Sequence, residues 1–166
     1  AYQGSGNDGQ KETGLRTPAD HRGRITSNGA SYFDMGVTST GTVVAAWFTP
    51  GEGTGAGTLK LAYNETPLTT PGDWTVRAQP ISSDGGSHVI LRIDPNDHIH
   101  LSYLDASTAY MNYSYLPAYD SADVDIKTVF VDALFSNGQY NGMTIRDFGG
   151  GDYRPVISTF STTYGG

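Results

Sequence analysis

The chain has 166 residues, including 22 glycines, 8 prolines and 11 tyrosines, and it contains no cysteine. The absence of cysteine excludes disulfides and thiolate metal sites. The formal net charge of −7 disfavours nucleic-acid binding, which requires a basic face. No apolar run approaches the roughly 18 residues of a membrane-spanning helix, so we expect no transmembrane segment. The length indicates one domain, and the composition is more typical of an extracellular β-protein than of a cytosolic helical one.

The first 28 residues are polar and rich in glycine, with a single leucine and a single isoleucine. Such a segment has too few apolar side chains to form a core of its own. We therefore predict that residues 1–28 form a polar N-terminal arm that packs against its own domain or a neighbouring chain. Strand addition to the sheet edge of a neighbour is one hypothesis for this contact. The remaining residues, 29–166, are predicted to form a β-repeat domain.

An internal repeat runs through this domain. Residues 33–38 align with 89–94, and residues 43–48 align with 99–104, in both cases 56 positions apart. A third copy of the pattern begins at Met143. Within each copy, short alternating runs of Val, Ile, Tyr and Phe are separated by Gly, Asn and Asp clusters. This pattern predicts strands joined by tight turns.

The repeat predicts an all-β fold of antiparallel four-stranded meanders, each of about 56 residues and each resembling one propeller blade. Two units are complete, 29–85 and 86–138, and a partial unit covers 139–166. A propeller needs at least about four blades to close, so we expect an incomplete propeller. The alternative is a two-sheet β-sandwich.

The second unit contains the segment HVILRIDPNDHIHLSYLDASTAYMNYSYL, residues 88–116. It resembles the repeats of sialidase-like secreted β-propellers, and the resemblance extends over about residues 29–160. In that family, arginines from several blades clamp a substrate carboxylate, so the resemblance implies a ligand-binding role for Arg92 and Arg146, which occupy equivalent positions. The family's opening Arg-Ile-Pro motif and a complete Asp-box are absent, and we expect no catalytic residues.

Two tyrosines are further ligand candidates. Tyr113 and Tyr115 alternate along one strand and so share a face. Their rings could form a platform for sugar stacking or for a subunit contact, because both uses favour amphipathic rings. Packing inside the fold is the alternative for both residues.

A pair of histidines is the candidate metal site. His98 and His100 alternate on one strand, with Asp97 next to them. Two imidazoles and a carboxylate could hold a divalent metal, and the alternative is half-buried strand histidines satisfied by hydrogen bonds. Residues 94–97 have oxygen ligands suited to calcium, but they also fit the hairpin turn that the repeat requires.

Together these features predict a non-catalytic module that acts through protein–protein contacts in a larger assembly. We expect the mature form of an extracellular or cell-surface protein, without its signal peptide and without a required cofactor. Its partners would be other copies of the chain or a companion chain that completes the β-structure. The alternative is a carbohydrate-binding module, or a fragment of a sialidase-like glycoside hydrolase, with a glycan as its ligand.

Overall fold

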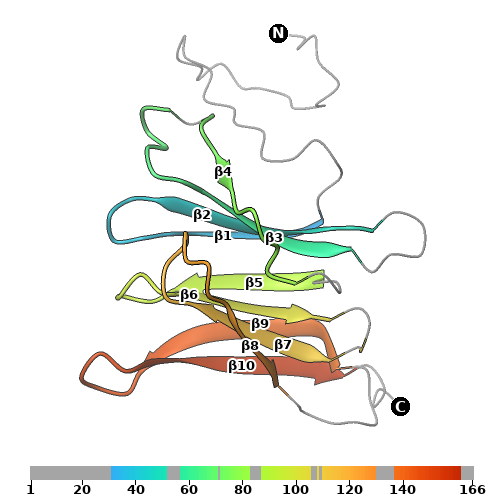
Figure 1. The fold of residues 1–166 in the computed structure, drawn as a ribbon. Helices are drawn as coiled ribbons and strands as arrows, with labels where there is room; N and C mark the ends of the chain where they lie inside the picture. Colours follow the sequence, from blue (N-terminus) through green and yellow to red (C-terminus); the bar gives the residue numbers. More distant parts are fainter. Residues whose placement is uncertain are drawn as a thin grey trace, which may run out of the picture.

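The computed structural model describes residues 31–51, 57–70, 72–82, 87–105, 108, 110–129 and 137–161. The predicted N-terminal arm lies outside these residues. The described part is all-β, as the repeat predicts, and its strands are all antiparallel. It forms three sheets rather than the two of a sandwich. The sheets lie one over another in chain order (Figure 1).

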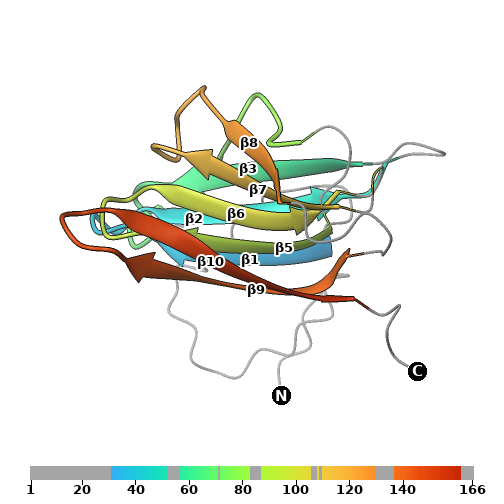
Figure 2. The ribbon, with the colours of Figure 1, turned by 90° about the horizontal axis from the view of Figure 1, so that it is seen from below.

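The first two sheets are four-stranded meanders and the third is a hairpin. The first sheet contains β1 (Ser31–Val37), β2 (Val43–Thr49), β3 (Thr58–Asn64) and β4 (Thr75–Val76). The second sheet contains β5 (Ser87–Ile93), β6 (Ile99–Leu104), β7 (Met111–Leu116) and β8 (Asp125–Val129). The third sheet contains β9 (Asn137–Asp147) and β10 (Tyr153–Ser161). The first strands of the sheets, β1, β5 and β9, lie along the same side of the stack (Figure 2).

The first hairpin of each sheet turns at a residue that tolerates a positive φ. In the β1–β2 hairpin this residue is Gly41, with φ of 92°. In the β5–β6 hairpin it is Asp97, with φ of 64°. In the β9–β10 hairpin, residues 149–151 are consecutive glycines with positive φ. Glycine has no Cβ to clash in this region, and aspartate is one of the few other residues that enters it.

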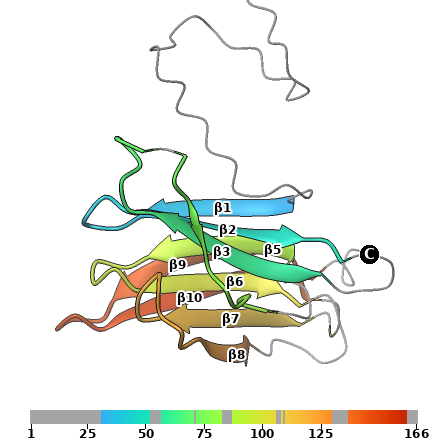
Figure 3. The same ribbon diagram turned by 45° about the horizontal axis from the view of Figure 1, so that its top comes forward.

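The two faces of each sheet have different neighbours. We call the face turned toward the N-terminal side of the stack the leading face, and the opposite face the trailing face. Alternation along β5 places Leu91 on the leading face and Arg92 on the trailing face. A Cβ on Gly36 of β1 would lie 2.9 Å from Leu91 Cδ2, whereas Arg92 Nε donates to Met143 O of β9 at 3.1 Å. The second sheet is therefore covered by the first sheet on its leading face and by the third on its trailing face, and Figure 3 shows its strands in the order β5 to β8.

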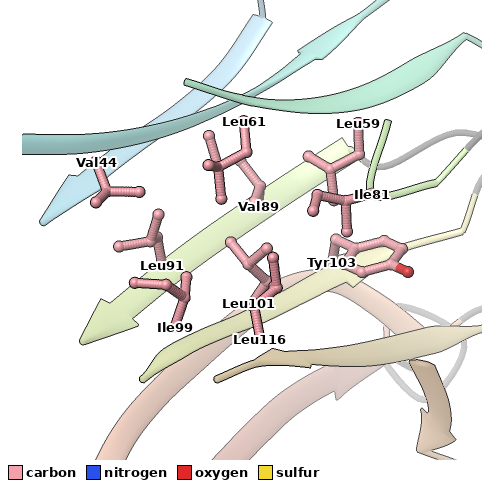
Figure 4. Close-up of a cluster of buried hydrophobic side chains, with 11 residues drawn as sticks. Val44, Leu59, Leu61, Ile81, Val89, Leu91, Ile99, Leu101, Tyr103 and Leu116 are labelled. Atoms are coloured by element: carbon pink, nitrogen blue, oxygen red, sulfur yellow. The ribbon is translucent and has the colours of Figure 1, made fainter. Parts of the chain in front are cut away.

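The hydrophobic core lies between the first and second sheets (Figure 4). Its buried members are aliphatic residues and one tyrosine, with Gly36 leaving room for the tips of Leu91 and Ile93. The cluster consists of Val44, Ala46, Leu59, Leu61, Ile81, Val89, Leu91, Ile99, Leu101, Tyr103 and Leu116. Burial of these apolar side chains, at about 25 cal/mol per Å², is the principal force that holds the two sheets together.

The outer side of the same pair of sheets is joined by polar and aromatic contacts. Arg77, just after β4, donates from Nη2 to the main-chain oxygens of Ser121 and Ala122 beyond β7, both at 2.9 Å. The rings of Tyr63 and Tyr119 lie 4.7 Å apart between centroids. These contacts fix the loop between β7 and β8 against the first sheet.

Candidate functional site

A buried carboxylate joins the two candidate histidines. Asp94, at the end of β5, accepts hydrogen bonds at Oδ2 from His98 Nδ1 at 2.9 Å and from His100 Nε2 at 3.2 Å. Its Oδ1 accepts from the main-chain N–H groups of Asn96 and His98, which shape the hairpin turn. Asp94 and His100 are both buried, while His98 is partly exposed. The sequence predicted Asp97 as the carboxylate of this group, and the geometry places Asp94 there.

Burial and hydrogen bonding set the charge states of this group. Burial alone would raise the pKa of Asp94, but its hydrogen bonds from His98, His100 and Asn96 outweigh that effect and lower the pKa. Burial lowers the pKa of His100, and the favourable interaction with Asp94 offsets this effect only in part. At neutral pH we therefore assign a carboxylate on Asp94 and a neutral imidazole on His100.

Tyr113 extends the group by one more hydrogen bond. Its hydroxyl lies 2.8 Å from His100 Nδ1. Because the carboxylate of Asp94 only accepts hydrogen bonds, the imidazole proton is on Nε2, and Nδ1 accepts the hydrogen of the tyrosine hydroxyl. Burial, aided by the nearby Tyr115, Asp125 and Asp94, raises the pKa of Tyr113 to about 12. The phenol keeps its proton, so this geometry supports a structural hydrogen-bond chain rather than an activated nucleophile.

Of the two remaining candidate residues, Tyr115 lies beside that chain and Asp97 does not. The ring of Tyr115 lies edge-on to His98 and His100, with centroid distances of 5.4 and 5.5 Å. Asp97 lies apart from the histidines: both its carboxylate oxygens accept hydrogen bonds from Ser39, one from the main-chain N–H and one from the hydroxyl, each at 2.6 Å. Among the described residues, no three His, Asp or Glu side chains are arranged to hold a metal ion.

The two candidate arginines have separate partners. Arg92 Nη1 pairs with Asp34 Oδ2 at 3.0 Å, and its Nε donates to Met143 O. Arg146 lies over the ring of Phe148, with its Cζ 4.9 Å from the ring centroid. Arg92 thus links all three sheets by their first strands, whereas Arg146 lies on the trailing face of the third sheet. The structure does not bring the two guanidinium groups together on one ligand position.

The leading face of the first sheet carries an exposed apolar row that the sequence pattern alone did not single out. Phe33, Met35 and Val37 alternate along β1 and are 51%, 49% and 61% exposed. They point away from the second sheet, because Gly36, which alternates with them, faces it. The repeat places them in register with Val89, Leu91 and Ile93, the residues of β5 that are packed in the core or against it.

The exposed part of this face is narrow. On the neighbouring strands β2 and β3, the leading-face residues Ala45, Trp47 and Ala62 are buried. The apolar row is therefore one strand wide and runs along the β1 edge of the sheet. An apolar row of this kind, on the outermost strand of the described sheet, is a typical docking surface for a further protein element.

Fold and surface together define the class of this protein: a β-meander repeat protein whose sheets stack face to face. No protein-family model matches the chain, and no curated protein shows significant similarity to it. In the described part of the chain, no helix has the length and apolar character needed to cross a bilayer.

Proposed function

We propose that this chain is a non-catalytic β-module that acts through protein–protein contacts in a larger assembly, outside the cell or at its surface. The observation that carries the proposal is the exposed row of Phe33, Met35 and Val37. The equivalent row of the second sheet is covered by the first sheet. A contact partner would cover the row on β1 in the same way and remove its apolar area from water.

Two further observations argue against a catalytic centre at the predicted residues. Arg92 and Tyr113, two of the candidate ligand-binding residues, already pair within the chain, with Asp34 and His100 respectively. The Asp94–His100–Tyr113 chain holds a protonated phenol, which is a poor nucleophile. A composition rich in Gly, Ser, Thr, Asn and Tyr and poor in Lys and Glu remains the basis for the extracellular prediction, and the resemblance to sialidase-like blades remains a prediction.

Site-specific photo-crosslinking tests the proposal. A photoreactive residue replaces Val37 on the exposed row or, as a control, Leu68, which is 91% exposed on the loop after β3. The full chain carrying each is produced in its native host and irradiated. We expect discrete protein adducts from position 37 and none, or only diffuse ones, from position 68. Failure of position 37 to form any protein adduct would refute the proposal.

One feature favours carbohydrate binding as a second candidate. Tyr113 and Tyr115 share the trailing face of the second sheet with Asp125 and Lys127 of β8, which form an exposed ion pair at 2.9 Å. Aromatic rings beside exposed polar groups are a common arrangement for sugar recognition. A glycan array distinguishes this candidate, because the proposal predicts a hit that Tyr115→Ala removes. A blank array would leave the protein-contact function as the only candidate.

A further inference from the structure

We infer that the partner of the exposed row is a second copy of this chain, bound head to tail. The trailing face of one copy's third sheet packs on the leading face of the other copy's first sheet. This inference rests on the proposed function and specifies its partner.

The argument begins with the two sheet-on-sheet contacts inside the chain. The first sheet contacts the second, and the second contacts the third, each time by a trailing face against a leading face. The same sequence repeat builds all three sheets. The trailing face of the third sheet is therefore equivalent to the trailing faces of the first and second sheets, each of which packs on the leading face of the next sheet. The stack leaves one leading face and one trailing face uncovered by a described sheet, and the repeat relates these two faces to pairs of faces that pack together inside the chain.

The leading face offers the apolar side of this contact. Met35 on β1 is 49% exposed, while its equivalent Leu91 on β5 is 1% exposed. Met35 and Leu91 occupy the same position in the first strand of their sheets. The residue before each, Asp34 or Ile90, points to the opposite face. The difference in exposure therefore arises from the missing neighbour and not from the position within the sheet.

The trailing face of the third sheet carries an exposed valine, Val156, among the exposed polar residues Thr144, Arg146, Arg154 and Ser158. In β9, Asn141 points toward the second sheet, since its Nδ2 donates to His88 O at 2.8 Å. Met143 has the same parity and pairs with Ile157 of β10, so the neighbouring Val156 points to the trailing side. Val156 is 47% exposed, whereas its repeat equivalent Val44 is fully buried in the core.

Widths also agree. The described third sheet has two strands, β9 and β10, and its contacts with the second sheet involve mainly β5 and β6. The exposed apolar strip on the first sheet follows β1, because Ala45, Trp47 and Ala62 on the same face of β2 and β3 are buried. A two-stranded sheet that repeats the internal packing would reach this strip without displacing the buried side chains.

The repeat also predicts one polar contact of this interface. Arg92 Nε donates to the main-chain oxygen of Met143, on the first strand of the next sheet. Arg146 is the repeat equivalent of Arg92, and Phe33 is equivalent to Met143. In a head-to-tail pair, Arg146 of one copy would therefore donate to the main-chain oxygen of Phe33 in the second copy. This contact uses a different surface of each copy, which makes the interface heterologous and able to form rings or open chains.

Native mass spectrometry of single and mixed variants tests this geometry. Met35→Glu disables the leading face and Val156→Glu disables the trailing face, with Leu68→Glu as the matched control. The native chain and the control should form dimers and larger oligomers, with masses that are two or more times the monomer mass of 17.7 kDa. Each single variant alone should give only monomer. An equimolar mixture of Met35→Glu and Val156→Glu should form a heterodimer, because each retains the face that the other lacks.

The outcomes separate this inference from the proposed function. Circular dichroism first confirms that each variant keeps the β-fold of the native chain. If Val156→Glu still self-associates, or if the mixture stays monomeric while the native chain associates, the head-to-tail geometry is wrong although assembly stands. If the native chain is monomeric at every concentration, a second copy is overturned as the partner. Crosslinked adducts from position 37 to a different protein would then still support the proposed function.

Discussion

Asp34 and Arg92 are joined across the boundary between the first and second sheets, with Arg92 Nη1 3.0 Å from Asp34 Oδ2. The same oxygen accepts the main-chain N–H of Leu91 at 2.9 Å. One carboxylate therefore satisfies both a charged side chain and a main-chain donor of β5. The two interactions differ in environment, because the Arg92 side chain is 44% exposed and the amide of Leu91 lies in a partly buried position.

This difference predicts unequal effects of removing the two partners. Arg92→Ala should lower the free energy of unfolding by about 0.2–1 kcal/mol, as expected for an exposed ion pair. Asp34→Ala should lower it by about 1–3 kcal/mol, because the N–H of Leu91 also loses its acceptor. Urea denaturation measures both values. Because Arg92→Ala also removes the bond to Met143 O, Asp34→Ala is measured in the Arg92→Ala background as well. No further loss there would show that the bond to the Leu91 amide contributes nothing.

We expect position 36 not to tolerate a side chain, because the two sheets approach closely there. A Cβ there would lie 2.9 Å from Leu91 Cδ2 and 3.0 Å from Ile93 Cδ1. Gly36→Val should therefore separate the two sheets and lower the free energy of unfolding by about 1–3 kcal/mol. Gly72→Val is the control, since a Cβ on Gly72 would meet no atom within 4 Å. The same loss at both positions in urea denaturation would contradict the close approach of the sheets.

Equivalent repeat positions should respond differently to truncation. Leu91→Ala removes a fully buried side chain and should lower the free energy of unfolding by about 2–5 kcal/mol. Met35→Ala, at the equivalent position on the exposed row, should change the stability of the isolated chain by no more than about 0.5 kcal/mol. Denaturation at low protein concentration makes the comparison on the monomer. A large loss for Met35→Ala under those conditions would mean that the row is covered within one chain.

The low pKa of His100 predicts loss of stability in mild acid. In the unfolded chain this histidine takes up a proton near pH 6.5, whereas burial in the fold lowers its pKa. The unfolded state then binds more protons, so stability falls as the pH decreases through about 6.5. Asp94, whose pKa is also lowered in the fold, adds a further loss below about pH 4.

The histidine contribution is measured by urea denaturation between pH 7.5 and 5.5. His100→Gln should flatten the slope of stability against pH over this range, whatever its effect on stability at pH 7.5. Burial also lowers the pKa of His88, which acts in the same direction, so His88→Gln is the comparison variant. An unchanged slope in His100→Gln would contradict the assignment of a neutral imidazole to the buried position.

The raised pKa of Tyr113 predicts that the stability of the fold also depends on pH in the alkaline range. Its pKa of about 12 in the fold exceeds the usual value near 10, so stability decreases as the pH rises from 10 toward 12. Tyr113→Phe should remove this contribution and, at neutral pH, lower the free energy of unfolding by about 0.5–1.5 kcal/mol through loss of the bond to His100. Tyr115→Phe leaves that bond intact and is the control. An equal loss in both variants would indicate a general effect of the hydroxyl groups.

The repeat predicts the sheets well because strand alternation and turn residues are local properties of the sequence. The 56-residue spacing of Phe33 and Val89 correctly aligns β1 with β5. Alternation says which side chains share a face, but it does not say whether a neighbour covers that face. Phe33 and Val89 therefore look alike in the sequence, although one is exposed and the other is buried.

The arrangement of the histidines follows from the sequence only in part. His98 and His100 share one face, as the period of two requires, and Tyr113, a separate ligand candidate, joins them there; the carboxylate beside them is Asp94 rather than the predicted Asp97. The alternation itself contained the missing signal, because Asp94 has the same parity as both histidines. The turn chemistry of residues 94–97 obscured it: the positive φ of Asp97 turns that side chain toward Ser39 of the adjacent hairpin.

The second sheet has a described sheet against each of its faces, and this position has a dynamic consequence. Main-chain amides exchange with solvent through local openings, whose free energy rises with the packing that must be broken. The amides of β5 and β6 can open only if the contacts on both faces are lost. The amides of β9 and β10 need to lose contacts on one face only. Hydrogen exchange should therefore proceed inward, from the third sheet to the second, and the slowest amides of the chain should mark the centre of the stack.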